Sequence, residues 1–146
     1  MIIPDHRIKQ TRLGMGIIAE QRIKKGGLIW KHSNLHEFRL PLKLFQAMTQ
    51  YGYLDGNDVV VDLDESKFFN HSCDANMINS GDDCIAVRDI KPGEELTWDY
   101  GSTSLQEFVC RCGSDKCRGM IPSIMSPNIP QLKRPWHNTK SEERSP

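Results

Sequence analysis

The 146-residue sequence predicts one mainly β domain, a β-rich α+β fold of short twisted strands with one short helix. Short apolar runs are repeatedly bounded by glycine, proline, asparagine and aspartate, which is typical of strands joined by tight turns. Helical spacing of apolar residues occurs only near residues 41–50. Strands and helices do not alternate, so a parallel βαβ fold is disfavoured.

The first half of the chain contains the turns from which this fold is predicted to start. Residues 1–9 are expected to form an entry strand or loop. The Gly14-Met15-Gly16 segment predicts a tight turn before a strand, and it is either a plain hairpin turn or a place where backbone approaches a ligand. Leu28–Lys31 follows as a strand. Pro41 is expected in the first turn of the short helix.

The second half supplies most of the predicted strands. Tyr51–Asp58 holds two aromatic residues and then a turn, and Val59–Asp64 is the clearest strand because it is β-branched. The remaining strands are Met77–Asn79, Cys84–Arg88 and Leu96–Trp98, with a turn at Ser80–Asp83 joining the first two.

Charge and cysteine usage narrow the function classes. The formal net charge is zero, but residues 51–100 carry three basic against twelve acidic side chains. This block is either a solvated acidic face or a surface that attracts a basic partner. No apolar run is long enough for a membrane span or a signal peptide, so an intracellular, reducing location is expected, cytoplasmic or, in a eukaryote, nuclear.

Three cysteines within eight residues indicate a metal site. Cys110, Cys112 and Cys117 supply three thiolates, and structural zinc requires four ligands. Cys73 and Cys84 are the candidates for the fourth, and Cys84 fits a small buried residue in an alternating strand better. The spacing does not fit an autonomous zinc module with two Cys-x-x-Cys pairs.

Two further clusters, read together with these cysteines, carry a family resemblance. The runs Phe69-Asn70-His71-Ser72-Cys73 and Gly93–Tyr100, followed by the cysteine knuckle, resemble the SET-domain protein lysine methyltransferases. The Gly14-Met15-Gly16 turn matches the first cofactor motif of that family. The resemblance covers roughly residues 5–121. Ala75 replaces a proline usual in the family, and an insert common in histone-directed members is nearly absent.

The resemblance implies a compact SET-type fold with a C-terminal pseudoknot. It implies a SET domain at 1–109, a post-SET zinc knuckle at 110–121 and an irregular, partly disordered tail at 122–146. It also implies S-adenosylmethionine and one structural Zn²⁺ as cofactors, with Tyr100 as the catalytic residue. The implied cofactor-binding residues are Gly14, Met15, Gly16, Tyr51, Asn70, His71, Tyr100 and Phe108. Tyr53 and Trp98 would line the substrate channel, and the zinc ligands would be Cys73, Cys110, Cys112 and Cys117.

The chemistry of methyl transfer agrees with these residue types. An in-line transfer from a sulfonium to an amine requires two oriented, partly desolvated reactants, and an apolar aromatic channel lowers the pKa of the lysine amine. The expected partner is a protein with a lysine in a basic context, such as a histone, without nucleic acid or membrane. Two alternatives are a catalytically weak SET-like module that binds basic peptides and an unrelated zinc-stapled β domain that binds nucleic acid. The acidic middle block disfavours the latter.

Overall fold

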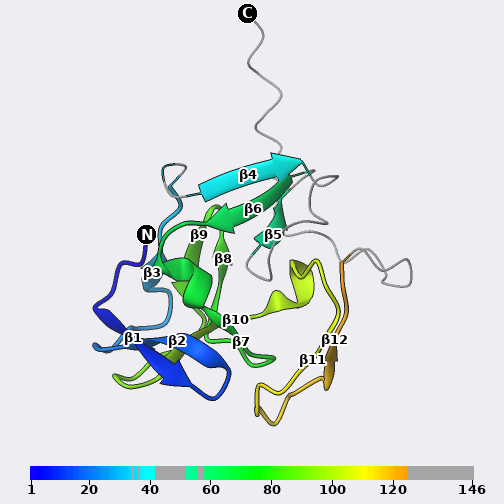
Figure 1. Ribbon diagram of the computed structural model, residues 1–146. Coiled ribbons are helices and arrows are strands. Elements are labelled where there is room, and N and C mark those ends of the chain that lie inside the picture. Colours follow the sequence, from blue (N-terminus) through cyan, green and yellow to red (C-terminus); the bar gives the residue numbers. More distant parts are fainter. Residues whose placement is uncertain (34, 36, 42–51, 56–57, 125–146) are drawn as a thin grey trace, which may run out of the picture.

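The computed structural model describes residues 1–33, 35, 37–41, 52–55 and 58–124, and its strand-rich architecture confirms the predicted fold class. Two 3₁₀ helices, η3 (Glu65–Phe68) and η4 (Tyr100–Ser102), interrupt the strands. The strands are β1 (His6–Thr11), β2 (Gly14–Ala19), β3 (Leu28–Trp30), β4 (Glu37–Pro41), β5 (Gly52–Asp55), β6 (Asp58–Asp62), β7 (Asn70–His71), β8 (Met77–Ser80), β9 (Asp83–Ala86), β10 (Glu95–Trp98), β11 (Phe108–Val109) and β12 (Met120–Ile121) (Figure 1). Within the described ranges, no helix is long and apolar enough to cross a membrane.

The sheet that organises the domain has the strand order β1-β2-β10-β7. The predicted glycine turn is a hairpin turn, since Thr11 pairs with Gly14 and Gly14 has a φ of 120°. β10 arrives from late in the chain and lies between β2, to which it is antiparallel, and β7, to which it is parallel. The β10–β7 pairing places the Asn-His segment beside the strand that leads to Tyr100.

Two three-stranded sheets complete the body of the domain. In the sheet β3-β9-β8, the predicted turn between β8 and β9 is confirmed, because Ser80 pairs with Asp83 and Gly81 has a φ of 65°. In the sheet β4-β6-β5, the predicted valine strand is confirmed as β6, and Val59 and Val60 are fully buried.

The segment around Pro41 differs from the prediction. Pro41 closes β4 opposite Asp58 instead of opening a helix, because proline is tolerated at the end of an edge strand. Residues 42–50, where the rest of the helix was predicted, lie outside the described residues. Part of the predicted turn region forms β5, which pairs with β6.

The hydrophobic core contains residues of the β1-β2-β10-β7 sheet and of the β3-β9-β8 sheet. Eleven buried residues form one cluster: Ile17, Ala19, Ile23, Ile29, Trp30, Phe69, Met77, Cys84, Ala86, Ile90 and Leu96. Phe69 is part of this core, so the residue directly before Asn70 is held by apolar packing. Packing of Phe69 in the core therefore fixes the position at which the Asn70-His71 segment begins.

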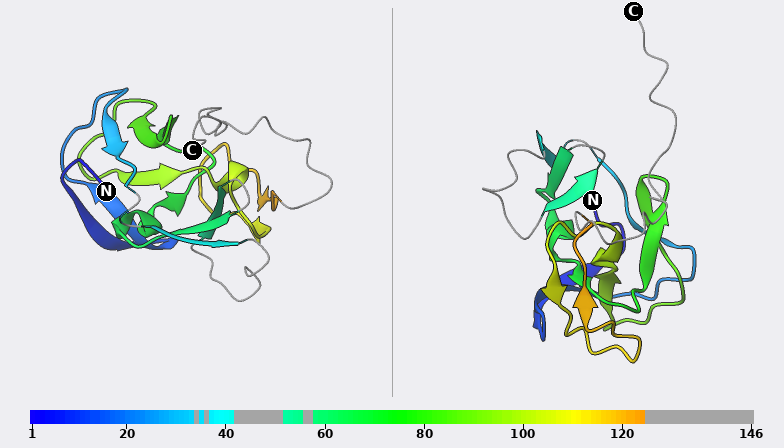
Figure 2. Two further views of the ribbon diagram at one scale, coloured as in Figure 1. Left: turned by 90° about the horizontal axis from the view of Figure 1, so that it is seen from above. Right: turned by 90° about the vertical axis from the view of Figure 1, so that its right-hand side faces the viewer.

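The β11–β12 pair forms one flank of the domain and faces the viewer in the right-hand view of Figure 2. Phe108 pairs with Ile121, so the two strands close the base of the loop that carries Cys110, Cys112 and Cys117. The first residues of the predicted tail are bonded to the body, with Ile124 N–H donating to the Ser104 carbonyl. Residues 125–146 lie outside the described residues.

Candidate active site and cysteine centre

Asn70 ties the two ends of the sheet together. Its Nδ2 donates to Glu95 Oε1 at 2.7 Å, to the Met15 carbonyl at 3.1 Å and to Thr11 Oγ1 at 3.3 Å. These acceptors come from β10, β2 and the end of β1. The amide nitrogen is thus used within the protein, and it fixes the hairpin turn against β7.

Gly16 is required by this same junction. A Cβ at Gly16 would lie 2.2 Å from Glu95 Oε1 and 2.8 Å from Asn70 Nδ2, closer than side chains can approach. The second glycine of the turn therefore makes room for the Asn70–Glu95 pair, whereas the sequence pattern suggested room for a ligand.

A large cavity of about 590 Å³ lies between the hairpin turn and the cysteine loop. Its walls include six of the predicted cofactor residues: Gly14, Met15, Asn70, His71, Tyr100 and Phe108. Gly16 does not line this cavity, and Tyr51 lies outside the described residues. Residues 109–112 form the wall on the side of the cysteine loop.

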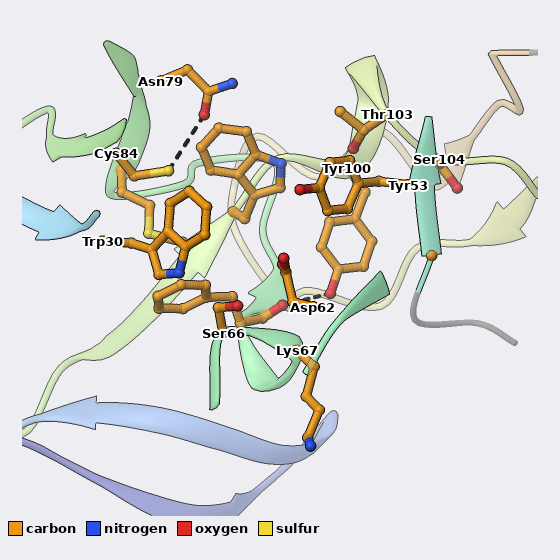
Figure 3. Close-up of a pocket in the computed structure, with 14 residues that line it drawn as sticks. Trp30, Tyr53, Asp62, Ser66, Lys67, Asn79, Cys84, Tyr100, Thr103 and Ser104 are labelled. Carbon is orange, nitrogen blue, oxygen red and sulfur yellow. Dashed lines mark hydrogen bonds between the residues drawn. The ribbon is translucent and has the colours of Figure 1, made fainter. Parts of the chain in front are cut away.

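A second cavity of about 150 Å³ has five aromatic residues on its wall. Trp30, Tyr53 and Tyr100 turn their rings toward a common space in Figure 3, and Phe69 and Trp98 also line it. The predicted channel residues Tyr53 and Trp98 are thus both on its wall. The two cavities share four lining residues: Gly52, Lys67, Tyr100 and Ser104.

Tyr100 lines both cavities, and its backbone N–H and its hydroxyl group each make a hydrogen bond. Its backbone N–H donates to His71 Nδ1 at 3.1 Å, and its hydroxyl donates to the Phe69 carbonyl at 2.5 Å. The local turn is fixed by Asp99, whose Oδ1 accepts from the Gly101 N–H at 2.9 Å as the N-cap of η4. Asp99 therefore fixes the backbone turn that orients Tyr100.

Asp62 contributes a carboxyl group to the aromatic cavity (Figure 3). Burial raises the pKa of Asp62 to about 6, and the nearby carboxylates of Asp64 and Glu37 add to the rise, while a hydrogen bond from Ser66 opposes it. Lys67 does not neutralise this group, because its side chain leads away from the cavity toward the β1–β2 hairpin and its Nζ lies 5.3 Å from the centre of the Phe68 ring.

The cysteine loop meets the Asn-His segment at Cys73. The Cys73 and Cys110 sulfurs are 3.7 Å apart, and the Cys110 thiol also contacts the thiols of Cys112 and Cys117. Two sulfurs on a tetrahedral zinc, each about 2.3 Å from the metal, are about 3.8 Å apart. The Cys73–Cys110 distance therefore fits two ligands of one zinc ion.

The thiols have different environments. Burial raises the pKa of Cys110 to about 12. Burial also opposes ionisation of Cys112, but hydrogen bonds from the backbone of Cys73 and Ser114 lower the pKa of Cys112 to about 6. Cys84 is separate from this group: its thiol donates to Asn79 Oδ1 at 3.4 Å, and burial raises its pKa to about 12.

A second set of metal-ligating atoms overlaps the first. One atom each from His71, Cys73, Cys110 and Cys112 lie within 4.8 Å of one another. Geometry alone therefore offers His71 or Cys117 as the fourth ligand. Burial and the charge of Arg118 lower the pKa of His71, while Asp99 and a hydrogen bond with the Trp98 backbone oppose the lowering.

Comparison with known proteins decides the family. The family model of the SET domain matches residues 14–101. The chain belongs to the SET-domain family. The match begins at the hairpin turn and ends just after Tyr100, so it contains both the Asn-His segment and the tyrosine but not the cysteine loop.

Curated relatives of this SET domain are much longer proteins. The histone-lysine N-methyltransferase TRX1 of Oryza sativa subsp. japonica is 31% identical over 133 residues, which is 76% of this chain and 13% of the rice protein. The histone-lysine N-methyltransferase ASHH2 of Arabidopsis thaliana is 36% identical over 138 residues, 79% of this chain and 8% of that protein. The chain thus spans only a small part of the length of these relatives.

A solved structure supports the fold. The methyltransferase domain of human histone-lysine N-methyltransferase SETMAR matches this SET domain with a TM-score of 0.63 at 19% identity. The match covers 84% of this chain and 59% of the human one. The SET-type architecture is thereby confirmed.

Some site residues could not be found from sequence patterns. Trp30 and Asp62 reach the aromatic cavity from β3 and β6, far from the family motifs. Glu95 holds Asn70, yet in the sequence it is one of two adjacent glutamates next to a turn. The available signal was the alternation of β10, which places Glu95 and Thr97 on one face of the strand.

Proposed function

We propose that this SET domain is a protein-lysine N-methyltransferase that uses S-adenosylmethionine. The observation that carries the proposal is the shared position of Tyr100 on a large cavity and on a small one with aromatic walls. A cofactor of nucleotide size fits the first cavity, and an unbranched alkylamine fits the second. Methyl transfer requires two such sites meeting at one point.

In the proposed reaction, different residues of the chain act in the two cavities. Bound S-adenosylmethionine supplies an electrophilic methyl group on a sulfonium. The aromatic walls exclude water from the lysine side chain, which favours loss of its proton to solvent before transfer. The Tyr100 hydroxyl donates a hydrogen bond to the Phe69 carbonyl, so its oxygen would act as the acceptor that orients the neutral amine. The amine then displaces the sulfide and leaves as a methylammonium.

One structural zinc on Cys73, Cys110, Cys112 and Cys117 belongs to the same proposal. Cys110 and Cys112 line the large cavity, so the metal would hold one wall of the cofactor site in place. The thiolate set requires a reducing, intracellular environment.

The proposed substrate is a lysine in a basic segment, such as a histone tail. Asp62, Asp64 and Glu37 gather near the aromatic cavity, with the side chain of Glu37 only 5% exposed. Glu37 and Asp64 already pair with Arg39 and with the N-terminal amine, so Asp62 is the carboxyl group on the cavity wall that would favour a cationic partner. The relatives named above are described as histone-lysine methyltransferases, and a nuclear location follows if this chain shares that substrate.

The test is methyl transfer from labelled S-adenosylmethionine to core histones and to a mixture of basic proteins, with mass spectrometry to find the modified lysine. We expect label on lysine in at least one of them. Cofactor binding without transfer would instead support a module that only binds basic peptides. Failure to bind the cofactor, in zinc-loaded protein, would overturn the assignment of the large cavity.

A further inference from the structure

His71 is hydrogen-bonded through both ring nitrogens, and its two partners belong to different sites. Nδ1 is 3.1 Å from the backbone nitrogen of Tyr100. Nε2 is 3.3 Å from the sulfur of Cys73. The side chain is 5% exposed, so each of these contacts replaces a contact with water. One buried imidazole therefore spans from the cysteine centre to the tyrosine.

The direction of both hydrogen bonds follows from the Tyr100 contact. A backbone N–H can only donate, so Nδ1 must be the acceptor and carries no proton. The ring proton is then on Nε2, which donates to the Cys73 sulfur. The Asp99 carboxylate lies 3.7 Å from Nδ1, beyond hydrogen-bond length, and it is held by Arg118.

This arrangement excludes His71 as the fourth metal ligand. Ligation through Nε2 would remove its proton, and the proton of a neutral ring would move to Nδ1. Nδ1–H would then face the Tyr100 N–H, donor against donor. Cys117 is thus the fourth ligand, and Cys73 is left to accept hydrogen bonds from His71 Nε2 and from the backbone N–H and Nε of Arg118, at 3.3 to 3.4 Å.

We propose that His71 is a positioning residue that couples the cysteine centre to Tyr100. It donates to the Cys73 thiolate and accepts from the Tyr100 backbone. Metal at the four cysteines fixes the charge and place of the Cys73 sulfur, and hydrogen bonds to charged sulfur are stronger than those to a neutral thiol. The ring is thereby locked in the orientation that anchors Tyr100. The role of Tyr100 in turnover rests on the proposed function, whereas the Cys73 contact does not.

Two substitutions separate the two contacts. In His71→Gln the amide nitrogen occupies the place of Nε2, so it keeps the donor to Cys73 and loses the acceptor for Tyr100. In His71→Asn the amide oxygen occupies the place of Nδ1, so it keeps the acceptor and does not reach Cys73. His6→Gln, at the start of β1, is the matched control.

Metal affinity and turnover are measured on the full chain, with zinc and with cobalt(II) as a spectroscopic substitute. For His71→Asn we expect a drop in metal affinity on the order of tenfold or more, because hydrogen bonds to ligands tune affinity by about 10- to 100-fold, and a smaller loss of turnover at saturating metal than in His71→Gln. For His71→Gln we expect near-normal metal affinity and a turnover at least tenfold lower than that of His71→Asn. Equal losses of metal affinity in both variants, with a changed cobalt spectrum, would identify His71 as a ligand and overturn the proposal.

Nitrogen-15 NMR of the zinc-loaded wild type tests the same idea without activity or substitution. The expected His71 ring has a protonated Nε2 and an unprotonated Nδ1, and a protonated Nδ1 would overturn the inference. If the wild type transfers no methyl group, the proposed function fails, while the tautomer and the metal affinities still decide the His71–Cys73 contact.

Discussion

At Tyr100, backbone, ring and hydroxyl are each constrained by a different part of the chain. The amide meets β7, the hydroxyl meets the carbonyl that precedes β7, and the ring lies 5.5 Å from the His71 ring and 6.2 Å from the Phe108 ring. Such redundancy holds a catalytic group in one orientation without cost at the moment of reaction. It also means that removal of the hydroxyl alone leaves the ring in place.

Tyr100→Phe is therefore expected to lose turnover on the order of a hundredfold, the usual scale for one oriented polar contact. Zinc content and cofactor affinity should change little, since the ring and backbone contacts stay. Single-turnover rates with a confirmed lysine substrate measure the effect. Tyr53→Phe, on the same aromatic cavity, is the comparison and should lose less. Rates near wild type in Tyr100→Phe would show that another residue has the catalytic role proposed for Tyr100.

The raised pKa of Asp62 predicts that the free energy of unfolding depends on pH. Its pKa rises from 3.8 in the unfolded chain to about 6 in the native state, so the native state binds more protons between these values. Stability contributed by this group is then present at low pH and is lost as pH rises through that window. Asp62→Asn should stabilise the protein at about pH 7.5 relative to wild type and change it little at about pH 4. Urea unfolding of both proteins at both pH values checks this, and an equal difference at both would contradict the assigned pKa.

At the scale of elements, the two-residue strand β7 matters more than its length suggests. It pairs with β10 through Thr97–Asn70 and Trp98–His71, which aligns both functional segments in one register. The Asn70 amide then ties this pair to the hairpin turn. The geometry of the site thus depends on Gly16, where any side chain would displace Glu95 and Asn70.

Gly16→Ala is expected to destabilise the domain by roughly 1–3 kcal/mol, as overpacking does, and to weaken cofactor binding because Met15 lines the large cavity. Gly81→Ala is the control: its φ of 65° strains the β8–β9 turn, but a Cβ there meets nothing within 4 Å. It should cost stability and leave cofactor affinity unchanged. Calorimetry with S-adenosylmethionine separates the two, and equal affinity in both variants would remove Gly16 from the site.

The strands that were predicted correctly have strong local signals, and those that were missed do not. Val59–Val61 is β-branched, and the β8–β9 hairpin has a glycine turn, so both follow from short-range chemistry. β7 is too short to show alternation and forms only because β10 pairs with it. β4 was missed because Pro41 is compatible with a helix start as well as a strand end.

Local sequence patterns also predict only part of the candidate site. Motif residues could be proposed from sequence because their types and order are distinctive, yet their contacts depend on long-range pairing. Asn70 was expected to hold the cofactor, and the structure shows its amide nitrogen bonded to Glu95 and Met15. Asn70 also lines the large cavity, so a contact between Asn70 and the cofactor stays a prediction.

At the scale of the whole molecule, the cysteine loop links the middle of the matched region to the segment that follows it. It joins Cys73, just after β7, to the segment between β11 and β12, and Lys116 Nζ reinforces this with a 2.8 Å contact to Asp74 Oδ1. The loop also supplies a wall of the large cavity. Metal binding and cofactor binding are therefore expected to be linked.

Chelation of zinc should abolish S-adenosylmethionine binding while most β structure remains, because the core cluster does not include the cysteine loop. Cys73→Ala should behave like the chelated protein, whereas Cys84→Ala should keep one zinc per chain. Metal analysis, cofactor calorimetry and circular dichroism on the three samples test this. Loss of zinc in Cys84→Ala with retention in Cys73→Ala would show that the wrong fourth thiol was chosen.

The insertion of β10 between β2 and β7 has a consequence for synthesis of the chain. The β1–β2 hairpin leaves the ribosome well before β10, yet β2 obtains its second neighbour only when Glu95 and Leu96 emerge, opposite Ile18 and Ile17. Until then the nascent chain exposes an unpaired, apolar strand edge, which is the kind of surface that aggregates or recruits chaperones. A ribosome-stalled fragment ending before β10 should therefore be protease-sensitive and chaperone-bound, and one extended past β12 should resist cleavage. This late closure makes translation speed through residues 71–95 a determinant of the yield of folded protein.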